Sequence, residues 1–164
     1  MSEDSKEQVL KFGQKLMYID TTSEILELVS SQAKTLLDAQ RCSIFVVDKE
    51  NHTFWTKVND GTQMIVIPLD TGIVGRTYKT KQAQIVNLPY EDKDFMSNVD
   101  EKIGFTTKNI VTAPVFDSNK ELISVIQLLN KIDTDFNDSD LKLLTFFANF
   151  ISGSLELSLM DDWL

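Results

Sequence analysis

The chain opens with two stretches in which apolar residues recur with the period of an α-helix. They occupy residues 5–18 and 21–40. The second begins with the capping box Thr21-x-x-Glu24, whose side chains satisfy free backbone N–H groups at a helix start. The stripes consist of Val9, Phe12 and Leu16 in the first stretch and Ile25, Leu28, Val29, Ala33, Leu36 and Leu37 in the second. We therefore expect two helices.

The pattern then changes to strands. Residues 41–47, 53–58 and 64–69 are rich in β-branched and aromatic side chains and are separated by turn residues. Two later runs, 109–116 and 121–129, flank a hairpin turn. Consecutive strands with short links pair antiparallel, so an antiparallel sheet is expected.

The middle of the chain contains shorter elements than the regions before it. The sequence T-G-I-V-G at 71–75 opens a short helix to about Lys81, and residues 84–87 form a brief strand. Residues 88–108 mix charged with isolated apolar residues, as in a lid or pocket wall.

The last helix is predicted at 138–160, where two apolar stripes require two partners. One partner is the sheet, and the other is either the helix at 5–18 or a second copy of the chain. The stripes are Leu141, Leu144, Ala148, Ile151 and Leu155, and Leu143, Phe147, Phe150, Ser154 and Leu157.

Charge and composition argue against several classes of partner and of site. The length of 164 residues fits one domain, and the net charge of −9 argues against nucleic acid or an anionic membrane as partner. No apolar run approaches the roughly 18 residues of a membrane span, and the acidic N-terminus is unlike a signal peptide. One cysteine, Cys42, excludes an internal disulfide and suggests a buried, inert thiol in a reducing cytoplasmic compartment. One histidine, His52, excludes a multi-histidine metal centre.

Several residues could bind a ligand. The T-G-I-V-G segment could expose N–H groups to a phosphate or be a plain tight turn. Asp60 is a turn residue or, if it faces a pocket, an acceptor for a purine edge. Asp100 is a solvated lid charge or a ligand contact, and Thr107 and Gln127 are neutral hydrogen-bonding residues near strand ends. Lys131 and Asp140 could clamp the last strand to the last helix, with Asp140 near the positive end of the helix dipole.

The order of these elements and five short motifs resemble a GAF domain of the cyclic-nucleotide-binding type, found in phosphodiesterases and some adenylyl cyclases. The resemblance covers about residues 22–159. The motifs are Cys42-Ser43-Ile44-Phe45, Gly72-Ile73-Val74-Gly75, Val99-Asp100, residues 104–110, and Asn130-Lys131 with Phe136 and Asp140. It implies an α+β fold, an α/β/α sandwich with a central antiparallel sheet of five or six strands. Terminal helices would cover one face and pocket helices the other, with an N-terminal dimerisation helix in 1–20 and the GAF domain in 21–160.

The resemblance also implies a function. The chain would be a non-catalytic sensor that binds cGMP or cAMP, with no metal or other cofactor. It would form a homodimer through its terminal helices and regulate an attached or partner signalling enzyme. Asp60 favours cGMP, because a carboxylate matches the N1–H and N2–H₂ donors of guanine together. The implied ligand residues are Ser43, Asn59, Asp60, Ile73, Val74, Met96, Asp100, Ile103, Thr107 and Gln127, and the pocket-closing motif is Asn130, Lys131, Phe136 and Asp140.

The sequence departs from the family pattern at four positions. Asn59 stands where an aromatic often stacks on the base, Met96 replaces a lid tyrosine, Ile103 replaces a hydroxyl residue, and Leu141 replaces a glutamate. The alternative function is therefore a GAF dimerisation module whose degenerate pocket binds no nucleotide. Sulfoxide reductases of this fold need several cysteines, and bilin-binding members need a pocket cysteine near a histidine, so neither activity is expected.

Overall fold

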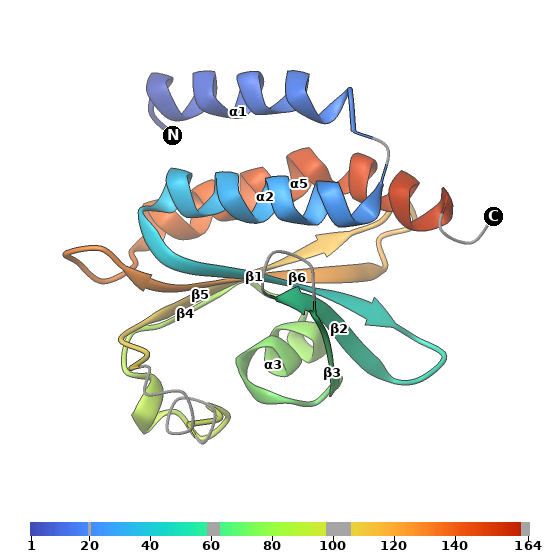
Figure 1. Ribbon diagram of the computed structural model, residues 1–164. Coiled ribbons are helices and arrows are strands. Elements are labelled where there is room, and N and C mark those ends of the chain that lie inside the picture. The colour runs from blue at the N-terminus through green and yellow to red at the C-terminus, as the bar shows by residue number, and fades with distance from the viewer. Residues whose placement is uncertain (20, 59–62, 98–105, 162–164) are drawn as a thin grey trace.

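The computed structural model describes residues 1–19, 21–58, 63–97 and 106–161. Figure 1 shows the arrangement of its elements. In chain order these are α1 (Glu3–Leu16), α2 (Thr22–Leu37), β1 (Ala39–Asp48), β2 (Thr53–Val58), β3 (Gln63–Pro68), α3 (Gly72–Thr80), β4 (Gln84–Val86), a 3₁₀ turn η1 (Pro89–Glu91), β5 (Ile110–Phe116), β6 (Leu122–Lys131) and α5 (Asp138–Asp161).

The strands form one antiparallel sheet in the order β3-β2-β1-β6-β5-β4. Six strands lie at the upper end of the predicted range. The first and last strands of the domain core, β1 and β6, pair at the centre of the sheet, so the fold closes through a contact between distant parts of the chain. The predicted α+β fold with an antiparallel sheet is confirmed.

Helices cover both faces of the sheet (Figure 1). Helices α2 and α5 lie side by side on one face with α1 outside them, and α3 lies on the other. The main core therefore fills the layer between the sheet and α2 and α5. Its largest fully buried side chains are Phe147, Leu37, Ile126, Leu128, Leu144, Ile151 and Leu155, and Phe12 of α1 extends the core to the outer side of α5.

Local chemistry fixes where the first helices begin and end. Ser2 and Thr21 are the N-caps of α1 and α2, and each side chain accepts a hydrogen bond from a backbone N–H three residues later. Helix α2 ends at Asp38, whose φ of 50° is left-handed and directs the chain into β1. The predicted capping threonine is therefore confirmed.

The two predicted stripes of α5 are only partly correct. Phe147 is buried in the main core beside Leu144 and Ala148, because its ring packs against Phe12 of α1 with centroids 5.2 Å apart. Helix α1 is thus a partner of α5. Phe150 and Leu157 of the second predicted stripe are instead exposed, together with Phe146 and Met160.

Helix α5 also corrects the expectation about membrane spans. Within the described residues, Asp138–Met160 is long and apolar enough to cross a membrane by length and composition. Its buried face, however, packs on β5 and α2 as part of the main core. A core helix passes the same test of composition, and this packing accounts for the apolar residues on the buried face of α5.

Candidate functional site

A row of polar side chains crosses the sheet on the face covered by α3. Ser43 of β1 is opposite Gln127 of β6, Gln127 is opposite Thr112 of β5, and Thr112 is opposite Gln84 of β4. Side chains at paired positions point to the same face. The hydroxyl of Thr112 lies 2.6 Å from that of Thr77 on α3, which fixes the face. Two predicted ligand residues, Ser43 and Gln127, are therefore brought together.

Apolar clusters flank this polar row on both sides. Val74 packs in one cluster with Phe54 and Val125, and Ile73 packs in the other with Val86 and Ile110. The adjacent residues Ile73 and Val74 thereby fix α3 to the sheet on either side of the row. A ligand at Ser43 and Gln127 would have polar groups beneath it and apolar walls beside it, the usual composition of a small-molecule site.

The N-terminus of α3 offers backbone donors near this row. Its N-cap, Thr71, makes no side-chain capping hydrogen bond, so the first-turn N–H groups are not satisfied by the cap. Gly72 adopts a φ of +63°, which favours glycine. A side chain at Gly72 would meet Met96 at 3.6 Å. The predicted phosphate turn and the predicted lid residue Met96 therefore lie next to each other.

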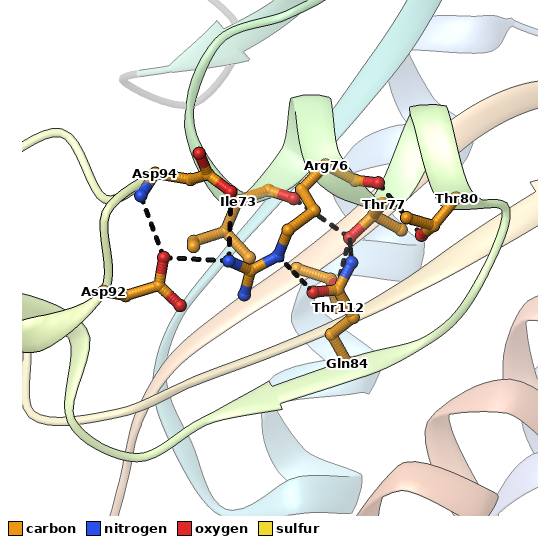
Figure 2. Close-up of polar contacts among 8 residues, drawn as sticks. All are labelled: Ile73, Arg76, Thr77, Thr80, Gln84, Asp92, Asp94 and Thr112. Atoms are coloured by element: carbon orange, nitrogen blue, oxygen red, sulfur yellow. Dashed lines mark hydrogen bonds and ion pairs between the residues drawn. The ribbon is translucent and has the colours of Figure 1, made fainter.

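Arg76 connects α3 to the segment that follows β4. Figure 2 shows its guanidinium between three acceptors. Nε donates to Oε1 of Gln84 at 2.5 Å, and one terminal nitrogen donates to carboxylates of Asp92 at 2.8 Å and Asp94 at 3.1 Å. Gln84 in turn donates to the Thr77 hydroxyl at 3.3 Å. The polar row, α3 and residues 92–94 thus form one hydrogen-bonded network, which we call the Arg76 network.

The pKa of Asp92 reports the strength of this network. Burial acts to raise it, but hydrogen bonds from the Asp94 N–H and the Arg76 guanidinium, together with the arginine charge, outweigh burial and hold the pKa below its ordinary value. A carboxylate with a lowered folded-state pKa adds stability above its unfolded pKa and loses it as the pH falls through the folded value. The network is therefore intact at neutral pH.

Substituting Arg76 should loosen this segment. Arg76→Met is expected to lower the free energy of unfolding by about 2 kcal/mol at pH 7, because charge-assisted hydrogen bonds to half-buried partners are lost. The difference from wild type should shrink as the pH falls through the lowered folded-state pKa of Asp92, where its carboxylate becomes protonated. Urea unfolding at several pH values measures both effects. Lys79→Met on the exposed side of α3 is the control, and an equal loss in both variants would contradict the network.

The motif residue Asn130 anchors the chain on the C-terminal side of the predicted lid. Its φ of 61° is left-handed, a conformation that asparagine tolerates. Its side-chain oxygen accepts from the Lys108 N–H at 2.6 Å, and its amide nitrogen donates to the Thr106 carbonyl at 2.9 Å. Thr107 lies between these two contacts and is buried. Asn130 therefore fixes the segment that contains the predicted ligand residue Thr107.

Lys131 and Asp140 form the predicted clamp between β6 and α5. Lys131 Nζ lies 2.5 Å from Asp140 Oδ1, and both side chains are largely buried. The other carboxylate oxygen accepts from the Asn137 N–H at 2.9 Å, while the Asp140 N–H donates to the Asn137 side chain at 3.0 Å. Asn137 and Asp140 therefore form reciprocal capping hydrogen bonds at the start of α5, and Asp140 also forms the ion pair with Lys131. Phe136 is buried beside it, as predicted.

The structure places six of the ten predicted ligand residues. These are Ser43, Ile73, Val74, Met96, Thr107 and Gln127. Asn59, Asp60, Asp100 and Ile103 lie outside the described residues. Sequence reasoning missed Thr77, Gln84, Thr112 and Arg76. Of these four residues, only Thr112 could have been found from the sequence, because it is a polar residue within an otherwise apolar strand.

Among the described residues, no three His, Cys, Asp or Glu side chains gather as a metal-binding group. Burial raises the pKa of the Cys42 thiol to about 12, although Ser30 and the charge of Lys34 act to lower it. The thiol therefore stays protonated at neutral pH, which agrees with the predicted inert cysteine.

Sequence comparison identifies the family to which this chain belongs. The model of the GAF domain matches residues 21–155. The chain belongs to the GAF domain family. A probable 3',5'-cyclic phosphodiesterase, pde-5, of Caenorhabditis elegans is 29% identical over 148 residues, which cover 82% of this chain and 20% of the relative. The dual 3',5'-cyclic-AMP and -GMP phosphodiesterase 11A of Takifugu rubripes is 28% identical over 173 residues, 90% of this chain and 19% of the relative. The chain spans about a fifth of these relatives.

Solved structures confirm the GAF fold. The GAF domain of an Acinetobacter phosphoenolpyruvate-protein phosphotransferase superposes with a TM-score of 0.81 at 16% identity, covering all of both chains. The free methionine-R-sulfoxide reductase of Neisseria meningitidis superposes with a TM-score of 0.76 at 13% identity, covering 98% of this chain and 95% of the other. At these identities the likeness establishes the fold alone.

Proposed function

We propose that this GAF domain is a regulatory sensor that binds a cyclic purine mononucleotide between α3 and the sheet. The observation that carries the proposal is the polar row of Ser43, Gln127, Thr112 and Gln84, flanked by apolar clusters and adjacent to the N-terminus of α3. Neutral hydrogen-bonding groups suit a base and ribose, and helix N–H groups suit a phosphate. The two phosphodiesterase relatives named above support a nucleotide ligand.

We further propose that cGMP binds more tightly than cAMP. A carboxylate at Asp60 can accept from both N1–H and N2–H₂ of guanine, whereas adenine offers only N6–H₂ on that edge. Against a net charge of −9, the phosphate would depend on local N–H donors rather than on long-range attraction. The nucleotide-bound domain would control an attached or partner signalling enzyme.

Isothermal titration calorimetry with cGMP and cAMP tests the proposal. We expect binding of both, with the lower dissociation constant for cGMP. Gln127→Ala should weaken binding about tenfold, because it removes a ligand hydrogen bond worth about 1.4 kcal/mol. Gln14→Ala, on the exposed side of α1, is the matched control and should bind as wild type does. Absence of heat with either nucleotide at high micromolar concentration would contradict the proposal and favour the alternative, a dimerisation module with a degenerate pocket.

We propose that the chain also forms a homodimer through α1 and α5. Exposed apolar residues on α5 follow the alternating spacing of a coiled-coil seam: Phe146, Phe150, Gly153, Leu157 and Met160. On α1, Leu10 and Met17 are exposed, and Gly13 between them lies against the ring of Phe150. The exposed residues of both helices thus meet in one apolar patch, which a second copy could cover.

Light scattering after size exclusion tests the dimer. Leu157→Glu should shift the wild-type dimer to a monomer, because it would bury two like charges in the interface. Glu27→Gln, on the exposed side of α2, is the control and should leave the dimer unchanged. A wild-type chain that stays monomeric at high micromolar concentration would contradict the dimer and leave nucleotide binding untouched.

A further inference from the structure

Thr56 of β2 carries a buried hydroxyl group that has no partner. The residue is only 4% exposed, and among the described residues it is the only one with a buried side-chain hydroxyl that makes no hydrogen bond. The buried hydroxyls of Thr77 and Thr112, by contrast, lie 2.6 Å apart and bond to each other. A buried hydroxyl without a partner lowers stability. A bound ligand would supply the partner that Thr56 lacks.

The side chain of Thr56 points to the face of the sheet that α3 covers. Phe54, two residues earlier on the same strand, packs with Val74 of α3, and side chains two positions apart on a strand share a face. The next residue, Lys57, points to the opposite face, because its Nζ donates to the hydroxyl of Ser23 on α2 at 3.0 Å. Thr56 therefore lies on the same face as the polar row.

The described residues leave this face partly open around Thr56. Ser43 of β1 and Gln127 of β6 are half-buried, and Ile65, which pairs with Thr56 from β3 and shares its face, is 39% exposed. Ser43 and Thr56 both border the opening between β1 and β2, whose described ladder covers only the residues nearest their hairpin. A ligand that lies on the polar row can therefore reach the Thr56 hydroxyl.

The place of Thr56 in the sheet suits the base of the nucleotide better than the phosphate. Ile73, at the N-terminus of α3, packs with Val86 of β4 and Ile110 of β5, so the proposed phosphate donors begin at that side of the sheet. Strand β2 lies on the other side of the central strands β1 and β6. Asp60, the proposed acceptor for the purine edge, is only four residues after Thr56 in the chain.

We propose that Thr56 is a further ligand residue of the nucleotide site and that its hydroxyl forms a hydrogen bond with the purine base. This inference rests on the proposed function of the site. A hydroxyl both donates and accepts, so it can donate to the carbonyl oxygen of guanine or accept from the amino group of adenine. Thr56 therefore strengthens the binding of both nucleotides, and the choice between them is left to Asp60.

Isothermal titration calorimetry of Thr56→Val and Thr56→Ser tests this hydrogen bond. Valine has nearly the shape of threonine without the hydroxyl, so it should weaken cGMP and cAMP about tenfold each and leave their ratio unchanged. Serine keeps the hydroxyl and should restore most of the affinity. If Thr56→Val binds as wild type does, or if serine is as weak as valine, the inference about Thr56 fails while nucleotide binding stands. A wild-type chain that binds neither nucleotide contradicts the proposed function as well.

Thermal unfolding of the ligand-free variants gives a second, independent readout. Thr56→Val should raise the unfolding midpoint, because it removes a buried hydroxyl that has no partner. Thr112→Val makes the same change at a hydroxyl that bonds to Thr77, so it should lower the midpoint. A gain in stability together with weaker binding marks a polar group that is retained for a ligand. If both substitutions lower the midpoint, the Thr56 hydroxyl is already satisfied in the free chain and the inference fails.

Discussion

Lys131→Ala is expected to lower the free energy of unfolding by about 3 to 5 kcal/mol, because it leaves the carboxylate of Asp140 buried without its charged partner. The ion pair is 2.5 Å long, and its two side chains are 16% and 9% exposed. Since Asp140 also receives the Asn137 N–H, the start of α5 should loosen together with the β6–α5 loop. Urea unfolding followed by circular dichroism measures the loss.

A matched control is available on the surface. The pair between Lys11 and Glu7 is 3.2 Å long, but its side chains are 69% and 65% exposed. Lys11→Ala should therefore change the free energy of unfolding by no more than about 0.5 kcal/mol. The double variant Lys131→Met with Asp140→Asn should lose less than the two single variants together, since it leaves no unpaired charge. Equal losses for Lys131→Ala and Lys11→Ala would show that burial does not set the strength of the clamp.

Gly75→Ala should destabilise the domain by about 3 kcal/mol through steric overlap. A Cβ at this position would lie 2.5 Å from the carbonyl carbon of Asp70 and 2.8 Å from the carbonyl oxygen of Leu69. Both are backbone atoms and cannot move aside as a side chain could. The turn before α3 would have to shift, and with it the N–H groups proposed to receive the phosphate. Cyclic nucleotide affinity should fall together with thermal stability.

Gly153→Ala provides the comparison for this variant. A Cβ at Gly153 meets nothing within 4 Å, and the residue lies on the exposed side of α5. Alanine is the better helix former, so the substitution should stabilise the chain by about 1 kcal/mol. Differential scanning calorimetry at concentrations too dilute for self-association compares the two variants. If both glycine substitutions change stability in the same direction and by the same amount, close packing at Gly75 is not the cause.

Local sequence patterns predicted most of the fold. The period of apolar residues placed the helices and strands, and Thr21 fixed the start of α2 because a capping interaction involves only neighbouring residues. The clamp of Lys131 and Asp140 was predicted for the same reason, since its two residues are nine positions apart. The contacts of Asn130 are different: they reach Thr106, Lys108 and Gln40, up to 90 positions away, and only the structure shows them.

The Arg76 network could not be found in this way. Arg76 is 8, 16 and 18 positions from Gln84, Asp92 and Asp94, without a recognisable spacing. Each is an ordinary polar residue of a helix, a short strand or a loop. Their meeting depends on how β4 pairs with β5 and how α3 packs on the sheet, which are long-range contacts.

The sequence by itself determined the family, the order of the elements and the clamp, because each is written in local periodicity or in a short motif. Only the tertiary structure decided which side chains share a face. The register of β1, β6, β5 and β4 aligned Ser43, Gln127, Thr112 and Gln84 into one polar row, and a shift of one residue in any strand would have turned its member to the opposite face.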